Sequence, residues 1–211
     1  FASVLMPGVQ HMRHTHLPEH KFVKGQPETG VEMAEDLERI AMNFGGENIA
    51  ACIIEPIAGS TGTLVPPKGY LKRIREICDK HGILLIFDEV ITGWGRTGSA
   101  FAAQEWNVKP DIMTMAKATT NGVVPMGVVA VKEEIYDSVL DASSAPEGTP
   151  ELFHGYTYSG IPVAVAAALA VQDIFDKEDI FKRAKEMSPY LQNGLQSLKD
   201  LKEIVSIRGY G

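Results

Sequence analysis

The chain has 211 residues, of which 45% are apolar and 22% are charged, as is usual for a soluble globular protein with room for one sizeable domain. Its formal net charge of −7, without any basic cluster, argues against a nucleic-acid surface. No apolar run is long enough to cross a bilayer. The two cysteines, Cys52 and Cys78, exclude a disulfide scaffold and a four-cysteine zinc site and favour a reducing compartment.

Both ends of the chain read as cuts through a larger protein. The first residue is Phe1, and the closing residues 207–211 look like a strand entering a turn. We therefore expect residues 1–200 to form a large domain that is incomplete at its N-terminal side, and residues 201–211 to begin a smaller C-terminal domain. We expect the whole protein to be cytoplasmic, although a missing targeting segment leaves an organellar location open.

In chain order, the first half alternates helices with strands. Residues 1–31 are rich in Pro, Gly and His and show no periodicity, so they predict a connecting segment. An amphipathic helix is expected over residues 33–44 and a buried strand over residues 49–54. Pro67 is expected to start the next helix, which runs to Gly82. The apolar residues 83–87 show no alternation, which is typical of a strand covered on both faces.

The second half continues in the same way, so the fold class is α/β with a mostly parallel sheet flanked by helices. Short strands are expected around residues 112–115 and 127–131. Residues 142–151 are small, polar and proline-rich and predict a surface loop. An Ala/Val-rich helix is expected over residues 162–175, with one or two further helices over residues 181–201.

Two of the expected strands end on a charged residue and then enter a glycine-containing loop. Asp88 closes one of these runs and Lys117 follows the other. Open α/β sheets bind ligands at the carboxyl ends of parallel strands. A lysine and an aspartate at one such edge supply what pyridoxal phosphate needs, namely an amine for a Schiff base and an acid that keeps the pyridine nitrogen protonated.

Each of these residues also has a plainer interpretation. Asp88 and Glu89 could be strand-end acids that face solvent. Alternatively, four apolar residues followed by Asp-Glu match the magnesium-binding strand of P-loop ATPases; the chain has no phosphate-binding loop of that class, although one could lie in a missing part. Lys117 could be a solvated surface lysine. Its neighbours Met115, Ala116 and Ala118 instead favour a partly buried amine, which would attack a carbonyl more readily.

Two further groups of residues carry weaker signals. The residues His11, His14, His16 and His20 do not share one helix face and have no accompanying acid or cysteine ligands, so solvated loop histidines are favoured over a metal site. The hydroxyl-rich residues 155–160 precede a predicted helix, where backbone N–H groups could hold an anion. Such helix entries are also ordinary caps.

Over nearly its whole length the chain resembles the class III (ω-amino acid) pyridoxal-phosphate aminotransferases. The resemblance rests on motifs in the family's order, at residues 53–60 (IIEPIAGS), 65–71 (VPPKGYL), 84–98 (LLIFDEVITGWGRTG), 110–117 (PDIMTMAK), 120–122 (TNG) and 154–160 (HGYTYSG). Residues 13–16 (RHTH) and 22–28 (FVKGQPE) favour the ω-amino acid–pyruvate, or β-alanine–pyruvate, branch. The resemblance implies a fold-type I pyridoxal-phosphate transferase.

The resemblance also implies roles for single residues. Lys117 would carry the cofactor as a Schiff base, Asp88 would pair with the pyridinium nitrogen, and Val90 would pack on one face of the ring. Glu55 would belong to the polar network near the cofactor's hydroxyl side. Thr157 would reach the cofactor phosphate of a neighbouring subunit, in a homodimer or a dimer of dimers. The implied activity is ping-pong transfer of an amino group from an ω-amino acid or amine to an oxo-acid such as pyruvate.

Some residues depart from the family's pattern. Ile161 stands where a histidine is usual, and Trp94 replaces a more usual phenylalanine, which we expect to affect mainly packing. Arg96 is expected to be structural and to hold the loop after Asp88. The family's phosphate-binding loop and its substrate-carboxylate arginine lie outside the chain, so we expect these residues alone to be inactive. An aminomutase of the glutamate-semialdehyde type and a non-enzymatic cofactor-binding protein stay open as alternatives.

Overall fold

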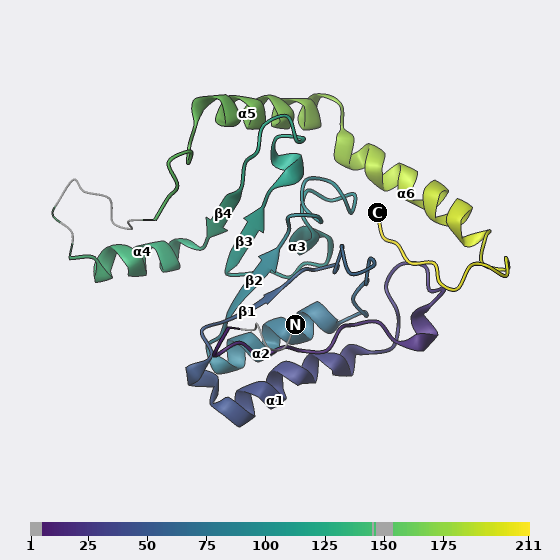
Figure 1. Cartoon of the computed structure of the whole chain (residues 1–211), viewed down its shortest axis with the longest axis horizontal. Helices are drawn as coiled ribbons and strands as arrows, with labels where there is room; N and C mark the ends of the chain where they lie inside the picture. The colour runs from purple at the N-terminus through teal and green to yellow at the C-terminus, as the bar shows by residue number, and fades with distance from the viewer. Residues whose placement is uncertain (1–5, 145, 147–153) are drawn as a thin grey trace. The chain divides into compact units, whose positions relative to one another are not determined.

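The computed structural model describes residues 6–144, 146 and 154–211 (Figure 1). The chain divides into two units. Unit 1 comprises Phe1–Leu85 and Ser188–Tyr210, and unit 2 comprises Ile86–Met187 with Gly211. The elements in chain order are η2 (Pro18–His20), η3 (Val31–Ala34), α1 (Glu35–Phe44), η4 (Gly46–Asn48), β1 (Ala51–Ile54), α2 (Tyr70–His81), β2 (Leu84–Asp88), α3 (Ala102–Glu105), β3 (Ile112–Met115), η5 (Lys117–Thr119), β4 (Val128–Val131), α4 (Glu133–Ala142), α5 (Pro162–Lys177) and α6 (Ile180–Gln196).

In unit 1, the helices α1 and α2 pack against each other through their apolar faces. Leu37 of α1 and the residues Leu71, Ile74 and Ile77 of α2 are buried, which gives the apolar spacing of an amphipathic helix a core to face. The guanidinium of Arg73 also donates hydrogen bonds to both carboxylate oxygens of Glu35, from Nε to Oε1 at 2.6 Å and from Nη2 to Oε2 at 3.1 Å. Packing therefore joins these helices, and ion pairs fix their register.

The sheet is mixed, and its strand order is β1-β2-β3-β4. The division into units falls inside β2, whose second half pairs with β3 in parallel and aligns Asp88 with Thr114. Strands β3 and β4 pair antiparallel. Along β2 the buried residues Leu85 and Phe87 alternate with half-buried ones. The uninterrupted apolar run predicted a strand buried on both faces. One face of β2 is buried, and the other is half-buried.

In unit 2, the buried carboxylate of Glu89 anchors the loop that follows β2. It accepts hydrogen bonds from the Thr92 hydroxyl at 2.7 Å and from the backbone N–H groups of Ala102 and Ala103 at 2.9 and 2.8 Å. Desolvation raises the pKa of Glu89 above its ordinary value, while the three donors act in the opposite direction. Glu89 thereby closes the loop of residues 90–101 onto the first turn of α3, so the alternative interpretation of Glu89 as a strand-end acid facing solvent is wrong.

The same loop fastens the turn that follows β3. The indole Nε1–H of Trp94 donates to the Thr119 hydroxyl at 2.9 Å, and that hydroxyl donates to the Ala116 carbonyl at 3.0 Å. The Trp94 ring also packs edge-on against Phe101 and stacks on Phe175 of α5. Trp94 therefore does more than fill space, because a phenylalanine here would keep the ring contacts and lose the hydrogen bond.

Most expected elements are confirmed, with boundaries within a few residues. Helix α4 was not expected, and the loop predicted over residues 142–151 lies largely outside the described residues. Pro67 does not start a helix: it closes a turn by accepting the N–H of Tyr70, where α2 begins. Residues 204–211 form neither helix nor strand. The proposed domain boundary at residue 201 stays a prediction.

Across residues 6–144, 146 and 154–211, we find no helix with the length and apolar character that a membrane span requires.

We predict that Glu89→Gln lowers the free energy of unfolding of the full-length protein by about 1–3 kcal/mol. The amide oxygen still accepts on one side, but the amide NH₂ faces a backbone N–H and leaves it buried without an acceptor. The change is measured by urea unfolding, with Glu134→Gln on the exposed face of α4 as control. Equal stability of the two variants would contradict the anchoring role.

We predict that Trp94 and Thr119 are energetically coupled. Trp94→Phe and Thr119→Val each remove the same hydrogen bond, so their effects on unfolding should not add. A double-mutant cycle should give a coupling energy of about 0.5–1.5 kcal/mol. Trp94→Phe with Ser138→Ala, on α4, serves as an uncoupled pair. Strict additivity of Trp94→Phe and Thr119→Val would show that the bond does not stabilise the turn.

Candidate active site

The parallel pairing of β2 with β3 brings Asp88 and the approach to Lys117 to one edge of the sheet in unit 2. Asp88 is the last residue of β2 and aligns with Thr114, and Lys117 follows two residues after β3 ends at Met115. Since parallel strands end at a common edge, both charged side chains emerge there. The structure thus supports the juxtaposition that the sequence predicted.

The backbone at Lys117 is strained. Its φ is +48°, and Asn121, at the far end of the same turn, has a φ of +51°. The left-handed region costs a residue with a Cβ about 1–2 kcal/mol, and such outliers gather at functional sites. The turn is closed by the N–H groups of Thr120 and Gly122, which donate to the Lys117 carbonyl at 3.3 and 3.2 Å.

The Lys117 side chain is exposed, although its apolar neighbours favoured a partly buried one. Met115 is buried, but Ala116 and Ala118 are only half-buried, and the left-handed turn directs the chain away from the sheet. Within the described residues the amine has no hydrogen-bond or ion-pair partner. It is therefore accessible to a ligand.

Lys117 lines a cavity of about 390 Å³ in unit 2, together with Val90, Ile91, Arg96, Ala118, Asn121 and Gly122. The cavity thus unites two of the expected site residues, Lys117 and Val90. It also contains Arg96, which was expected to be structural. The loop is held by Glu89 and Trp94 instead, while the Arg96 side chain is exposed.

The donor and acceptor groups at this edge fit a pyridoxal group. One carboxylate oxygen of half-buried Asp88, Oδ1, accepts the backbone N–H of Val90 at 3.0 Å, which fixes the side chain and leaves Oδ2 for a second donor such as a ring N–H. The amine of Lys117 lies in the cavity beside Val90, whose side chain offers an apolar wall for a ring. These three residues provide an amine, an acid and a packing surface.

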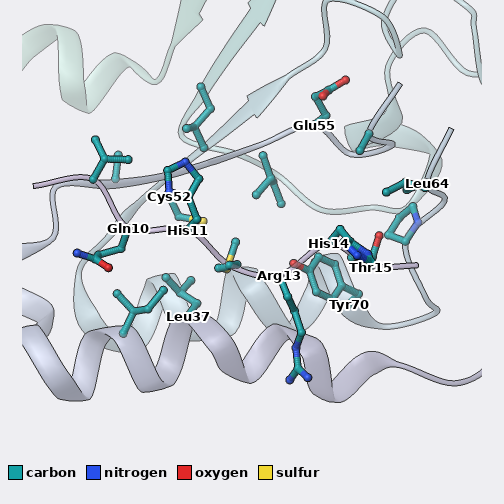
Figure 2. A pocket seen from close by; sticks show the side chains of 18 of the residues that line it. Gln10, His11, Arg13, His14, Thr15, Leu37, Cys52, Glu55, Leu64 and Tyr70 are labelled. Carbon is teal, nitrogen blue, oxygen red and sulfur yellow. The ribbon is translucent and has the colours of Figure 1, made fainter. Parts of the chain in front are cut away.

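Glu55 lies in unit 1, directly after β1, where its Oε2 accepts the N–H of Gly59 at 2.9 Å. It lines a second cavity of about 1360 Å³, confined to unit 1. Figure 2 shows Cys52 on β1, Glu55 after it and Tyr70 at the start of α2 around the segment that carries His11 and Arg13. The role of Glu55 near the cofactor's hydroxyl side stays a prediction.

The histidines of the N-terminal segment have different surroundings. His11, His14 and His16 line the cavity of unit 1, and burial together with the charge of Arg208 lowers the pKa of His16. His20 is buried, with Nδ1 accepting the N–H of Leu17 at 3.2 Å, so it is not the solvated residue that we expected. In the part of the chain that the structure describes, no cluster of His, Cys, Asp or Glu could hold a metal ion.

Thr157 lies in an exposed turn ahead of α5 and does not line the cavity of Lys117. The turn is closed locally, because the Ser159 hydroxyl accepts the N–H of Tyr156 at 2.9 Å. Ile161 is the N-cap of α5 and has no polar side chain to cap it. Among the described residues, none forms a hydrogen bond with the Thr157 hydroxyl.

Comparison with known proteins agrees with this geometry. The family model for class-III aminotransferases matches residues 2–211. An ω-aminotransferase of Caulobacter vibrioides is 53% identical over 98% of this chain and 47% of its own length. A β-alanine–pyruvate aminotransferase of Pseudomonas aeruginosa is 47% identical over 96% of this chain and 45% of its own length. The chain thus spans about half the length of these relatives.

A solved structure shares the fold. An (S)-enantioselective ω-transaminase of Thermomicrobium roseum aligns with a TM-score of 0.80 and 42% identity, covering 85% of this chain and 39% of that one. This likeness confirms the predicted fold-type I α/β architecture, and the cofactor of this family is pyridoxal phosphate. With its strand-end aspartate, its strained lysine turn and a family match over residues 2–211, the chain belongs to the class-III aminotransferases.

Proposed function

We propose that the whole protein is a pyridoxal-phosphate-dependent transaminase that moves an amino group from an ω-amino acid or amine to an oxo-acid such as pyruvate. The observation that carries this proposal is the strained, exposed Lys117 beside Val90, at the sheet edge where Asp88 ends β2. The names of the two relatives support the donor and acceptor classes.

Asp88, Lys117 and Val90 have different roles in the proposed reaction. Pyridoxal phosphate, when bound, supplies an aldehyde that takes up amines and a protonated ring that stores an electron pair. Asp88, whose orientation is fixed by the Val90 N–H, would keep the ring nitrogen of that group protonated. Lys117 would hold the group through its amine and, when that amine is free, would serve as the base and then the acid of proton transfer. Val90 would supply the apolar wall for the ring.

An oxo-acid acceptor completes the cycle by the reverse sequence, so the kinetics should be ping-pong. The need for an external oxo-acid distinguishes a transaminase from an aminomutase, which reacts without one. Amino transfer that depends stoichiometrically on added pyruvate supports the proposal. We also propose a cytoplasmic location, in keeping with the two buried cysteines Cys52 and Cys78, which form no disulfide in the part of the chain that the structure describes.

We further propose that the protein acts as a homodimer through the surface around Thr157 and α5. Tyr156 and Tyr158 are 80% and 81% exposed. On α5 the small residues Ala164 and Ala168 are buried, while Val163 and Leu169 are 61% and 62% exposed. An apolar face of this kind beside an unengaged threonine fits a second copy of the chain better than water.

The proposed role of Lys117 predicts where the cofactor is attached. Reduction of the full-length protein with borohydride in the presence of pyridoxal phosphate should leave one pyridoxyl group on Lys117, located by peptide mapping. Lys117→Ala should abolish that label and lower amino transfer by more than about a thousandfold, because both the attachment point and the proton carrier are lost. Lys109→Ala, which alters another lysine of unit 2, should label normally.

The Asp88→Asn variant distinguishes attachment of the cofactor to Lys117 from the amino-transfer reaction itself. This variant should still be labelled on Lys117, while its turnover falls by at least about a hundredfold, because a neutral amide does not hold the ring nitrogen protonated. A folded wild-type protein that takes no label on Lys117 would overturn the proposal. Normal turnover by Asp88→Asn would overturn the role of Asp88.

The proposed dimer surface predicts how a charge on α5 affects the oligomeric state. Leu169→Lys places a charge on the exposed face of α5 and should shift the full-length protein from dimer toward monomer in light-scattering chromatography. Met42→Lys is the control, because Met42 is also an apolar and exposed residue, on α1 of unit 1. A monomeric wild type, or a Leu169→Lys dimer as stable as the control, would contradict the proposed surface.

A further inference from the structure

Trp94 has a strained backbone, as Lys117 does. Its φ is +59°, and a bulky aromatic residue is a genuine outlier in the left-handed region. Such a conformation persists only where the surrounding structure holds it, and residues of this kind gather at functional sites. The side chain of Trp94 is also the one that reaches the turn of Lys117, through its hydrogen bond to Thr119.

Thr119 holds the peptide group that precedes Lys117. The Ala116 carbonyl accepts two hydrogen bonds from Thr119, one from its N–H at 3.1 Å and one from its hydroxyl at 3.0 Å. This carbonyl belongs to the planar peptide unit whose nitrogen is that of Lys117. Because the orientation of that plane sets φ at Lys117, Thr119 restrains the strained conformation from its N-terminal side.

The peptide group that follows Lys117 is held as well. Its carbonyl accepts the N–H groups of Thr120 and Gly122 at 3.3 and 3.2 Å. The backbone of a residue has only two soft dihedrals, and here hydrogen bonds restrain the planes on both sides of the Lys117 Cα. The direction in which the lysine side chain leaves the turn is therefore fixed by the backbone.

Trp94 orients the Thr119 hydroxyl. Thr119 is 2% exposed, so its hydroxyl depends on partners inside the protein. A hydroxyl has one proton to donate; because this one accepts the indole N–H at 2.9 Å, its own proton is directed to the Ala116 carbonyl. The Trp94 ring is held by Phe101 and Phe175, with ring centroids 5.0 and 6.1 Å away. A ring fixed by packing thus fixes the hydroxyl.

We propose that Thr119, oriented by Trp94, is a positioning residue that directs the Lys117 amine toward the atoms between which it carries a proton. This inference rests on the proposed transaminase function and adds a residue on which the rate of that transfer depends. Thr119 takes no part in the transfer itself. Proton transfer needs heavy atoms about 2.6–3.2 Å apart, so a small shift of the lysine backbone is enough to slow it.

The test replaces the Thr119 hydroxyl by a methyl group in the full-length protein with its cofactor. Thr119→Val should lower kcat for amino transfer from β-alanine to pyruvate about tenfold, because a misplaced catalytic group slows the chemical step. Both KM values should stay within about twofold, and borohydride should still label Lys117. Trp94→Phe should lower kcat by a similar factor, and the double variant should fall no further. Thr119→Ser, which keeps the hydroxyl, should restore kcat to within about threefold.

A second measurement reports on the turn without turnover. Amide hydrogen exchange of the full-length protein with its cofactor, without substrate, should be at least about tenfold faster at Gly122 in Thr119→Val than in the wild type, because the Gly122 N–H donates to the Lys117 carbonyl. Thr119→Ser should exchange at the wild-type rate. Unchanged exchange at Gly122 in Thr119→Val would overturn the proposed link between Thr119 and the lysine turn.

A buried residue far from the turn provides the control for lost stability. Ile77→Val, in the core of unit 1, should lower Tm and leave kcat and the Gly122 exchange rate unchanged. A wild-type kcat in Thr119→Val, or a loss that Thr119→Ser does not restore, would overturn the positioning role. So would a fall in kcat that Ile77→Val reproduces at equal loss of Tm. A wild-type protein that takes no label on Lys117 and exchanges no amine would instead remove the proposed function itself.

Discussion

The parallel pairing of β2 with β3 is the interaction on which the site depends. It aligns Asp88 with Thr114, so the acid sits level with a point three residues before Lys117. Met115 ends β3 and Ala116 is also extended, so the Lys117 backbone lies about 10 Å further along the strand direction. The left-handed backbone at Lys117 stops the strand there and closes a tight turn, with two N–H groups bonded to the Lys117 carbonyl. Strand register and turn thus act together.

The turn has an energetic cost that the surrounding loop must offset. Lys117 has a positive φ that costs about 1–2 kcal/mol, whereas Asn121, which also has a positive φ, costs less because asparagine adopts this region readily. Against this stands the hydrogen bond from the Trp94 indole to Thr119, and Trp94 is itself held because Glu89 ties its loop to α3. A buried acid with no role in the chemistry therefore contributes to the position of the lysine. The Glu89 carboxylate tolerates burial because its three donors replace water.

The sequence predicted the parts of this arrangement that depend on local pattern. The strand-end positions of Asp88 and Lys117 followed from apolar runs that stop at a charge, and helix α2 followed from its apolar spacing. The roles of Glu89 and Trp94 were not predicted because their hydrogen bonds join residues 13 and 25 positions apart, whose proximity arises only in the folded chain. His20 was misjudged because its burial depends on tertiary packing, although its bond to Leu17 is local. The spacing of Glu89, one residue after a strand-end acid, was a usable signal: alternation along a strand places neighbouring side chains on opposite faces, so one of two adjacent acids turns inward. Helix α4 was missed because half of its residues are charged or polar and none is buried.

The surface around Thr157 differs from the turn at Lys117 in the polar groups that it leaves for a ligand. At Lys117 the backbone N–H groups of Val90, Asn121 and Gly122 donate within the chain. In the turn ahead of α5, the Thr157 hydroxyl has no partner among the described residues and lies between Tyr156 and Tyr158, which are 80% and 81% exposed. Covering those rings with a second copy would be favourable by about 25 cal/mol for each Å² of apolar surface removed from water. Association of two chains and capture of the cofactor phosphate would then reinforce each other, because the contact that buries Tyr156 and Tyr158 also delivers Thr157.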